Sequence, residues 1–151
     1  MCPRHTAIAR ERMAIVGTHV STKRDGRDEL RDTQFGRWII DVLRHLHDPV
    51  FLQSHPLSRY VAGEEGHPPG NPLRRDVMSA MDELCRAPVA NRTTTRGHDV
   101  LRLYYVQCLS RADIQNRLQI SRTEFHRALA KGQERLIQSL ARRWGAPVTT
   151  T

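Results

Sequence analysis

Basic side chains over residues 122–131 recur at a spacing that would place them on one side of a helix. The residues expected on that side, or at its edges, are Arg122, Thr123, His126, Arg127, Ala130 and Lys131. A guanidinium group can hold a phosphate or the edge of a guanine base through two parallel N–H donors, and an ammonium group binds phosphate as a point charge. The residue types and their spacing therefore predict a surface that binds a polyanion.

The opposite side of the same segment is apolar or small at a helical period. The residues on that side are Phe125, Leu129, Gly132, Leu136 and Leu140. Because residues three or four apart share one face of a helix, this stripe predicts a helix of more than four turns that packs on a core. Gly145 then favours the end of the helix, Pro147 prevents it from resuming, and Trp144 is expected to close the core.

Two helix starts of the same kind lie eleven residues apart in this region. Each has a serine that can cap the helix, an acidic residue three positions later, and an apolar pair that brackets the cap. The first set is Ser110, Asp113, Leu109 and Ile114, and the second is Ser121, Glu124, Ile120 and Phe125. A short helix, a turn and a long helix follow from these starts, and together they predict a helix-turn-helix.

Residues 100–136, VLRLYYVQCLSRADIQNRLQISRTEFHRALAKGQERL, resemble the fourth region of bacterial sigma factors, which reads the promoter element farther from the start site. The resemblance spans roughly a quarter of the chain and includes a closing pattern at Ala130, Lys131, Arg135 and Leu136. The helix-turn-helix of response regulators has a similar pattern, so the resemblance indicates a superfamily. It implies a trihelical domain whose long third helix, the recognition helix of the helix-turn-helix, enters the major groove of DNA.

The resemblance implies base contacts from Arg122, Thr123, His126 and Arg127, and phosphate contacts from Arg117 and Lys131. We add Arg111 and Arg142 to the expected phosphate contacts, because cations near the reader would supply salt-dependent affinity. The chain departs from the family pattern at Gln115, where the two helices press together, and at Gln119, where a turn glycine is usual. It also lacks an aromatic-rich second region, so we do not expect a complete sigma factor.

The sequence predicts an all-α protein with an N-terminal helical subdomain and a C-terminal helix-turn-helix domain. The expected divisions are a basic arm over 1–27, a helical subdomain over 28–86, a linker over 87–97, the helix-turn-helix domain over 98–145 and a tail over 146–151. Helices are predicted over 28–47, 49–53, 72–86 and 98–108, with loops over 63–71 and 87–97. The arm is either a disordered leader or a segment that follows DNA.

The net charge of +8 is concentrated at two places. Residues 97–145 carry nine basic and four acidic residues, and residues 1–27 carry six and two. This distribution is typical of a polyanion-binding module attached to a packing module. No stretch approaches the ~20 apolar residues that span a bilayer, and charges interrupt what would be the core of a secretory signal. We therefore expect a cytoplasmic bacterial protein without membrane contact.

The sequence contains no pattern typical of catalysis or metal binding. Cys2, Cys85 and Cys108 are too few and scattered for a zinc site or a disulfide framework, and the latter two are expected to pack as small hydrophobes on helical faces. His45 and His47 are two apart, whereas metal ligands on a helix are three or four apart. We expect no enzyme activity, no cofactor and no metal.

These observations predict a transcriptional regulator that binds double-stranded DNA in a sequence-specific manner. Two alternatives stay open: the trihelical domain contacts protein, with Arg127 and Lys131 on a solvated face, or the chain is an adaptor that binds RNA polymerase or a sigma factor with little DNA contact. Helix-turn-helix proteins commonly form dimers on paired half-sites. The face with Phe35, Trp38 and Val42 is therefore expected to be either a shared core or a homodimer surface.

Overall fold

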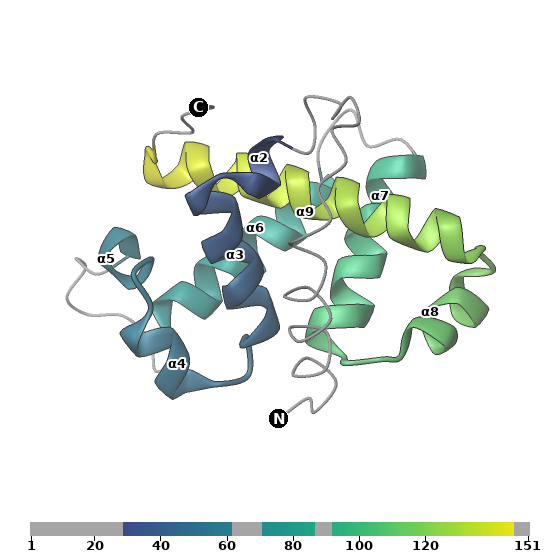
Figure 1. Cartoon of the computed structure of the whole chain (residues 1–151), viewed down its shortest axis with the longest axis horizontal. Helices are drawn as coiled ribbons and strands as arrows, with labels where there is room; N and C mark the ends of the chain where they lie inside the picture. The colour runs from purple at the N-terminus through teal and green to yellow at the C-terminus, as the bar shows by residue number, and fades with distance from the viewer. Residues whose placement is uncertain (1–28, 62–70, 87–91, 147–151) are drawn as a thin grey trace, which may run out of the picture.

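The computed structural model describes residues 29–61, 71–86 and 92–146, and in these ranges every regular element is helical (Figure 1). The elements are α2 (Glu29–Asp32), α3 (Gln34–Arg44), α4 (Pro49–Ser54), α5 (Ser58–Val61), α6 (Pro72–Arg86), α7 (Arg92–Leu101), the π-helical turn η1 (Arg102–Val106), α8 (Arg111–Leu118) and α9 (Arg122–Trp144). The predicted all-α class is confirmed for this part of the chain. The predicted arm over 1–27, most of the loop over 63–71, the start of the linker and the end of the tail lie outside the described residues.

The helix predicted over 28–47 is divided, because Thr33 caps a new helix in its middle. The Thr33 side-chain oxygen accepts the N–H of Gly36 at 3.0 Å and donates to the carbonyl of Leu30 at 2.7 Å. A Cβ atom on Gly36 would lie 2.1 Å from that carbonyl oxygen. Only glycine, which has no Cβ atom, therefore lets α2 pack this closely on the start of α3. The prediction of one continuous helix was wrong, since an amphipathic stripe does not by itself show an internal cap.

The face of α3 that carries Phe35, Trp38 and Val42 packs inside the chain. Phe35 and Val42 are buried, and Trp38 is half-buried. The Phe35 ring meets the edge of Trp144, with ring centroids 6.2 Å apart, so the last turn of α9 closes the core here. This face is therefore part of the core shared by the helices, which is the first of the two predicted alternatives.

The chain breaks before Pro49 and again before Pro56, and a buried histidine stabilises the second break. Asp48 caps α4 by accepting the N–H of Phe51 at 3.1 Å. After α4, the His55 ring is buried and its Nδ1 atom accepts the N–H of Leu57 at 3.2 Å. Burial lowers the pKa of His55, and nearby His45 adds to the lowering while the Asp41 carboxylate opposes it. Helix α6 has the predicted bounds, from Pro72 to Arg86.

The helix predicted over 98–108 begins and ends earlier than expected. It begins at Arg92, inside the segment predicted as a linker, and after Leu101 it continues as the π turn of η1. The N–H of Gln107 donates to the carbonyl of Arg102 at 2.9 Å, and Cys108 follows outside the helix with a φ of 56°. The predicted packing of Cys85 and Cys108 on helical faces was wrong, because Cys108 lies in the segment between η1 and α8 and Cys85 is exposed.

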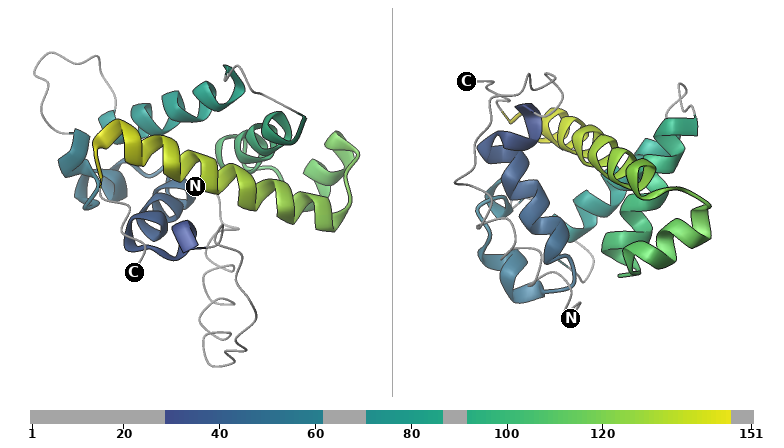
Figure 2. Two further views of the ribbon diagram at one scale, coloured as in Figure 1. Left: turned by 90° about the horizontal axis from the view of Figure 1, so that it is seen from above. Right: turned by 45° about the vertical axis from the view of Figure 1, so that its right-hand side comes forward.

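Helix α9 is the element that joins the rest of the fold, and it runs along the whole molecule (Figure 2). It packs against α7 and α8, and also against α2, α3 and α6. The buried residues therefore form one cluster with members from both halves of the chain, including Val42, Leu73, Leu101 and Leu140. Of the predicted inward stripe of α9, only Leu129 is half-buried rather than buried.

In the described part of the chain, no helix has the length and apolar character needed to cross a membrane.

Candidate nucleic-acid interface

The corner between α8 and α9 is formed by Gln119 and Ile120. Gln119 has left-handed backbone angles, with φ 52° and ψ 49°. Its N–H donates to the carbonyl of Asn116 at 3.4 Å, and the N–H of Ile120 donates to the carbonyl of Gln115 at 3.0 Å. This pair of bonds is the Schellman pattern that ends many helices, usually with glycine at the left-handed position. The Gln119 side chain adds a second bond to the Asn116 carbonyl, which favours the turn in the absence of glycine.

Both predicted helix caps are confirmed. The Ser110 hydroxyl oxygen accepts the N–H of Asp113 at 3.0 Å, and the Ser121 hydroxyl oxygen accepts the N–H of Glu124 at 3.2 Å. At the second cap the Glu124 carboxylate also accepts the N–H of Ser121 at 2.7 Å, which completes a capping box. These hydrogen bonds from Ser121 lower the pKa of Glu124, with smaller contributions from Arg96 and Arg127. The start of α9 is therefore fixed by local bonds.

Close packing against α7 sets the rotation of α9 about its axis. Phe125 is fully buried, and its ring meets the edge of Tyr104 at 5.9 Å between centroids. About two turns later, a Cβ atom on Gly132 would lie 2.7 Å from the carbonyl oxygen of Gly97. The two helices thus touch through backbone at this crossing. Since one side of α9 is held in this way, the opposite side is the one presented outward.

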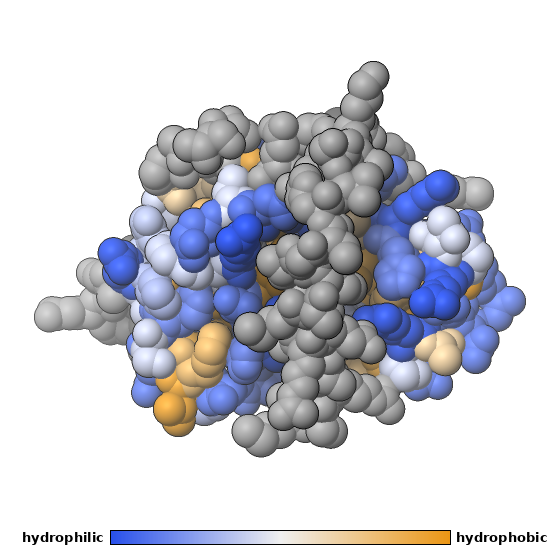
Figure 3. All heavy atoms as spheres, viewed as in Figure 1, coloured by the Kyte–Doolittle hydropathy of each residue, from blue (hydrophilic) through white to orange (hydrophobic). Residues whose placement is uncertain are grey.

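The residues predicted to read bases lie on the outward side of α9 or flank it at the exposed first turn. Exposed side chains at the start of α9 are those of Arg122, Thr123, His126 and Arg127, while Lys131 is half-buried. Within the described ranges, no carboxylate forms a salt bridge with Arg111, Arg117, Arg122, Arg127 or Lys131. Hydrophilic residues cover most of the end of the molecule that carries α8 and the start of α9 (Figure 3). This surface can therefore accept an anionic partner.

Three cationic or titratable side chains from α8 and α9 share one electrostatic neighbourhood. Partial desolvation lowers the pKa of His126, although the side chain is largely exposed, and the positive charges of Arg111 and Arg122 lower it further. The His126 ring also contacts Phe125, with centroids 5.3 Å apart. The charge at the first residue of α8 therefore acts on a side chain in the first turns of α9.

The structure does not bring every predicted phosphate contact to this surface. Arg111 and Arg117 lie exposed on α8, beside the start of α9. Arg142 is twenty residues beyond Arg122 on the same helix, which is about 30 Å along the axis at the usual rise of 1.5 Å per residue. It lines a surface hollow with Leu30 and Ala146 at the other end of α9. Arg142 is therefore separated from the other predicted contacts.

One basic residue beside the surface was not predicted from the sequence. Arg96 lies on α7, its side chain is 44% exposed, and its Nη1 atom is 3.8 Å from Oε1 of Glu124. Sequence reasoning missed it because the polar run before Gly97 is typical of a loop. A signal was present, since Gly97, Val100, Leu101 and Tyr104 have helical spacing and extend the helix backward.

No protein-family model matches the chain, and no curated protein or solved structure is significantly similar to it. The resemblance of residues 100–136 to sigma factor region four therefore stays a prediction that rests on those residues alone. Among the described residues, no group of three or more His, Cys, Asp or Glu side chains is arranged to hold a metal ion.

Proposed function

We propose that this chain is a bacterial transcriptional regulator that binds DNA through α8 and α9 and places the first turns of α9 in the major groove. The observation that carries the proposal is that Arg122 and Arg127 are exposed at the start of α9, while Phe125 packs on η1 and Gly132 packs on α7. An α-helix fits the width of the major groove, and its first turns are the ones that meet base edges. The resemblance to sigma factor region four supports the same proposal.

The proposal divides the side chains into two groups. Arg122, Thr123, His126 and Arg127 would contact bases, and Arg111, Arg117 and Lys131 would contact phosphates. We leave Arg142 out of the second group, because it lies about 30 Å along the helix from Arg122. Phosphate contacts give affinity for any sequence, whereas contacts to base edges give discrimination.

A salt series on a random duplex tests the proposal most directly. Each phosphate contact contributes about −0.9 to the slope of log affinity against log salt concentration, so three contacts predict a slope of roughly −3. Fluorescence anisotropy of a labelled duplex measures this slope. A weak or flat dependence would contradict the proposal.

Selection of preferred sites from a random oligonucleotide pool tests the sequence-specific part. On the selected site, Arg127→Ala is expected to cost about 1–3 kcal/mol and to relax the preference at one base position. Lys131→Ala should weaken binding to all sequences alike. Equal losses on every sequence for both variants would contradict the division of roles. A selected motif that repeats as a palindrome would indicate that two copies of the chain bind together.

An adaptor that binds RNA polymerase or a sigma factor is the second candidate. One observation favours it: α4 leaves Val50 73% exposed beside the half-buried ring of Phe51, which is an apolar surface far from α8 (Figure 3). The salt series separates the two candidates, because an adaptor requires no steep dependence for duplex binding.

A further inference from the structure

Arg96 reaches the start of α9 from a different helix, and the crossing of α7 and α9 explains how. A Cβ atom on Gly97 would lie 3.3 Å from the carbonyl oxygen of Ala128 and from the backbone of Gly132. Arg96 precedes this contact by one residue, and its guanidinium lies 3.8 Å from the Glu124 carboxylate, one turn before Ala128. The close contact at Gly97 thus places the neighbouring Arg96 side chain beside the outward side of α9.

The angular positions on α9 show which edge this is. At 100° per residue, Glu124 and Lys131 lie within about 20° of each other, next to Arg127 on the side toward α7. His126 lies on the other side of Arg127, toward α8, where the charge of Arg111 reaches it. The outward side is therefore bordered by cations from α8 on one edge and by Arg96 with Lys131 on the other.

A helix in the major groove has a sugar-phosphate strand along each side, because the groove is only about 12 Å wide. The phosphate contacts proposed above lie mostly toward α8, and Lys131 alone faces the strand on the α7 side. Arg96 has the charge and the reach to contact that second strand. Its pairing with Glu124 does not prevent this, since ion pairs between exposed side chains contribute only about 0–1 kcal/mol.

We propose that Arg96 is a phosphate-contacting residue of the DNA surface, held at the α7 edge of the recognition helix by Glu124 until a phosphate replaces that carboxylate. This inference rests on the proposed function. It extends the DNA surface from the two helices of the helix-turn-helix to the helix that precedes them.

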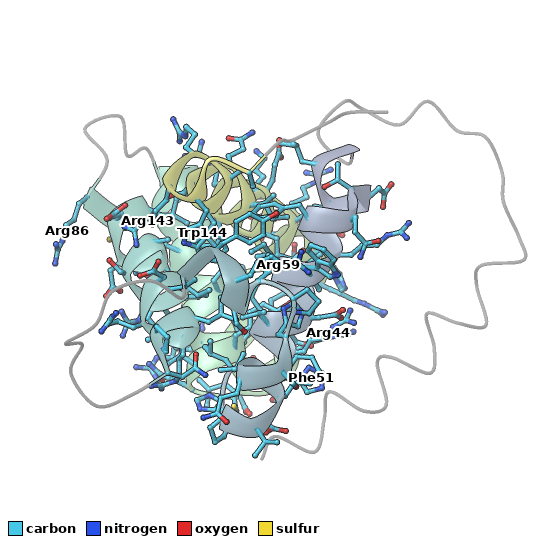
Figure 4. All side chains as sticks on the ribbon, turned by 90° about the vertical axis from the view of Figure 1, so that its left-hand side faces the viewer. Arg44, Phe51, Arg59, Arg86, Arg143 and Trp144 are labelled. Atoms are coloured by element: carbon cyan, nitrogen blue, oxygen red, sulfur yellow. The ribbon has the colours of Figure 1, made fainter. Side chains whose placement is uncertain are left out.

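A double-mutant cycle separates this role from a purely local one. The variants are Arg96→Ala, Glu124→Gln and the two combined, and glutamine at position 124 keeps a side-chain acceptor for the capping box. Arg59→Ala is the matched control, because it removes one exposed arginine on α5 at the opposite end of the molecule (Figure 4). Binding of each protein to a random duplex is measured by anisotropy across a salt series, and thermal unfolding checks that each variant is folded.

If Arg96 contacts phosphate, its removal lowers the salt slope by about 0.9, so the ratio of wild-type to variant affinity shrinks by about three- to fourfold between about 50 and 200 mM salt. The same loss is expected in the Glu124→Gln background. A loss that disappears in that background would mean that Arg96 only neutralises Glu124, and a variant that behaves like Arg59→Ala would also overturn the inference. A wild-type chain without salt-dependent duplex binding would instead overturn the proposed function, and this inference with it.

Discussion

The two ends of α9 carry arginines in opposite settings. At the first end, Arg122 and Arg127 are exposed and form no salt bridge with any described residue. At the last end, Arg143 forms an ion pair with Glu83 and donates to the backbone carbonyl of Asp76 at 3.3 Å. Residue type and helix are the same, so what differs is whether the fold supplies an acceptor. A basic segment is therefore a candidate binding surface only where tertiary contacts leave its charges unmatched.

Trp144 strengthens the contrast, because it fixes the last turn of α9 to the N-terminal half. Its indole Nε1 donates to the Asp76 carboxylate at 2.9 Å, and its ring stacks on Tyr60 with centroids 6.3 Å apart. Arg143 and Trp144 lie together at the end of α9 next to α6 (Figure 4). One end of the helix therefore serves packing, and the other end is available to a partner.

The largest effect is expected at Gly132, where α9 crosses α7 between these two ends. Gly132→Ala places a Cβ atom 2.7 Å from the Gly97 carbonyl oxygen and 2.9 Å from Leu101, and should lower the free energy of unfolding by about 1–3 kcal/mol. Gly132→Leu should lower the free energy of unfolding by more than that, or prevent folding. Urea unfolding measures both variants. The control is Gln138→Ala, which changes an exposed residue on the same helix and should keep the free energy of unfolding within about 0.5 kcal/mol of the wild type. A Gly132→Ala variant as stable as the wild type would show that the two helices are less closely packed at the crossing.

Removing one arginine from each end of α9 tests directly whether the two ends have separate roles. Arg143→Ala should lower the free energy of unfolding by about 1 kcal/mol, because it removes an ion pair and a hydrogen bond that are partly exposed, and should leave duplex binding unchanged. Arg127→Ala should do the reverse, with stability within about 0.5 kcal/mol of the wild type and weaker binding. The measurements are urea unfolding and anisotropy on the same four samples: wild type, each variant and the pair. Loss of binding in Arg143→Ala at full stability would contradict the proposed separation of the ends.

Acid should strengthen DNA binding at the first end through His126. The positive charges of Arg111 and Arg122 help to lower the pKa of this histidine in the protein alone, and a phosphate beside them would raise it. Binding would then take up a proton, so affinity should rise as pH falls below about 6.5 and level off beneath the lowered pKa. His126→Gln should remove most of this dependence and His45→Gln should retain it. A wild-type affinity that does not change between pH 5.5 and 8 would exclude the coupling.

Acid should weaken the packed half through His55. Because burial lowers the pKa of His55, the folded chain binds fewer protons than the unfolded chain just below pH 6.5. Stability is then complete above about pH 6.5 and declines as pH falls through the lowered pKa, since protonated Nδ1 can no longer accept the N–H of Leu57. His55→Gln should flatten this part of the profile of unfolding free energy against pH. An unchanged profile in that variant would assign the acid sensitivity to other groups.

The smallest effect is expected at the corner between α8 and α9. Gln119→Gly should raise the free energy of unfolding by about 0.5–1 kcal/mol, because a left-handed residue with a Cβ costs about 1–2 kcal/mol and glycine loses part of that gain through chain entropy. Asn116→Gly, three residues earlier within α8, should instead be slightly destabilising. Thermal and urea unfolding distinguish the two signs, and a destabilised Gln119→Gly would show that the side-chain bond to Asn116 outweighs the strain.

Much of α8, the corner after it and the start of α9 could be predicted because their signals are local. Ser110, Ser121 and Glu124 bond to backbone within three residues, so their spacing alone indicates where α8 and α9 begin. The break at Thr33 is also local, but an apolar stripe that continues through it conceals the cap. The early start of α7 was missed because its polar first turn is typical of a loop, and the contact of Gly97 with α9 joins residues about thirty positions apart.

The sequence by itself determined the helices that are marked by caps, prolines and the αL glycine at Gly145, since those marks act over one turn of chain. It also determined which residues are basic. Only the tertiary structure decided which of those charges face outward, because an arginine is matched or unmatched according to carboxylates and carbonyls that arrive from other helices. For the same reason Arg96 joined the surface, because its position depends on where α9 lies on α7, which no local pattern encodes. The separation of Arg142 follows instead from its place twenty residues along the same helix.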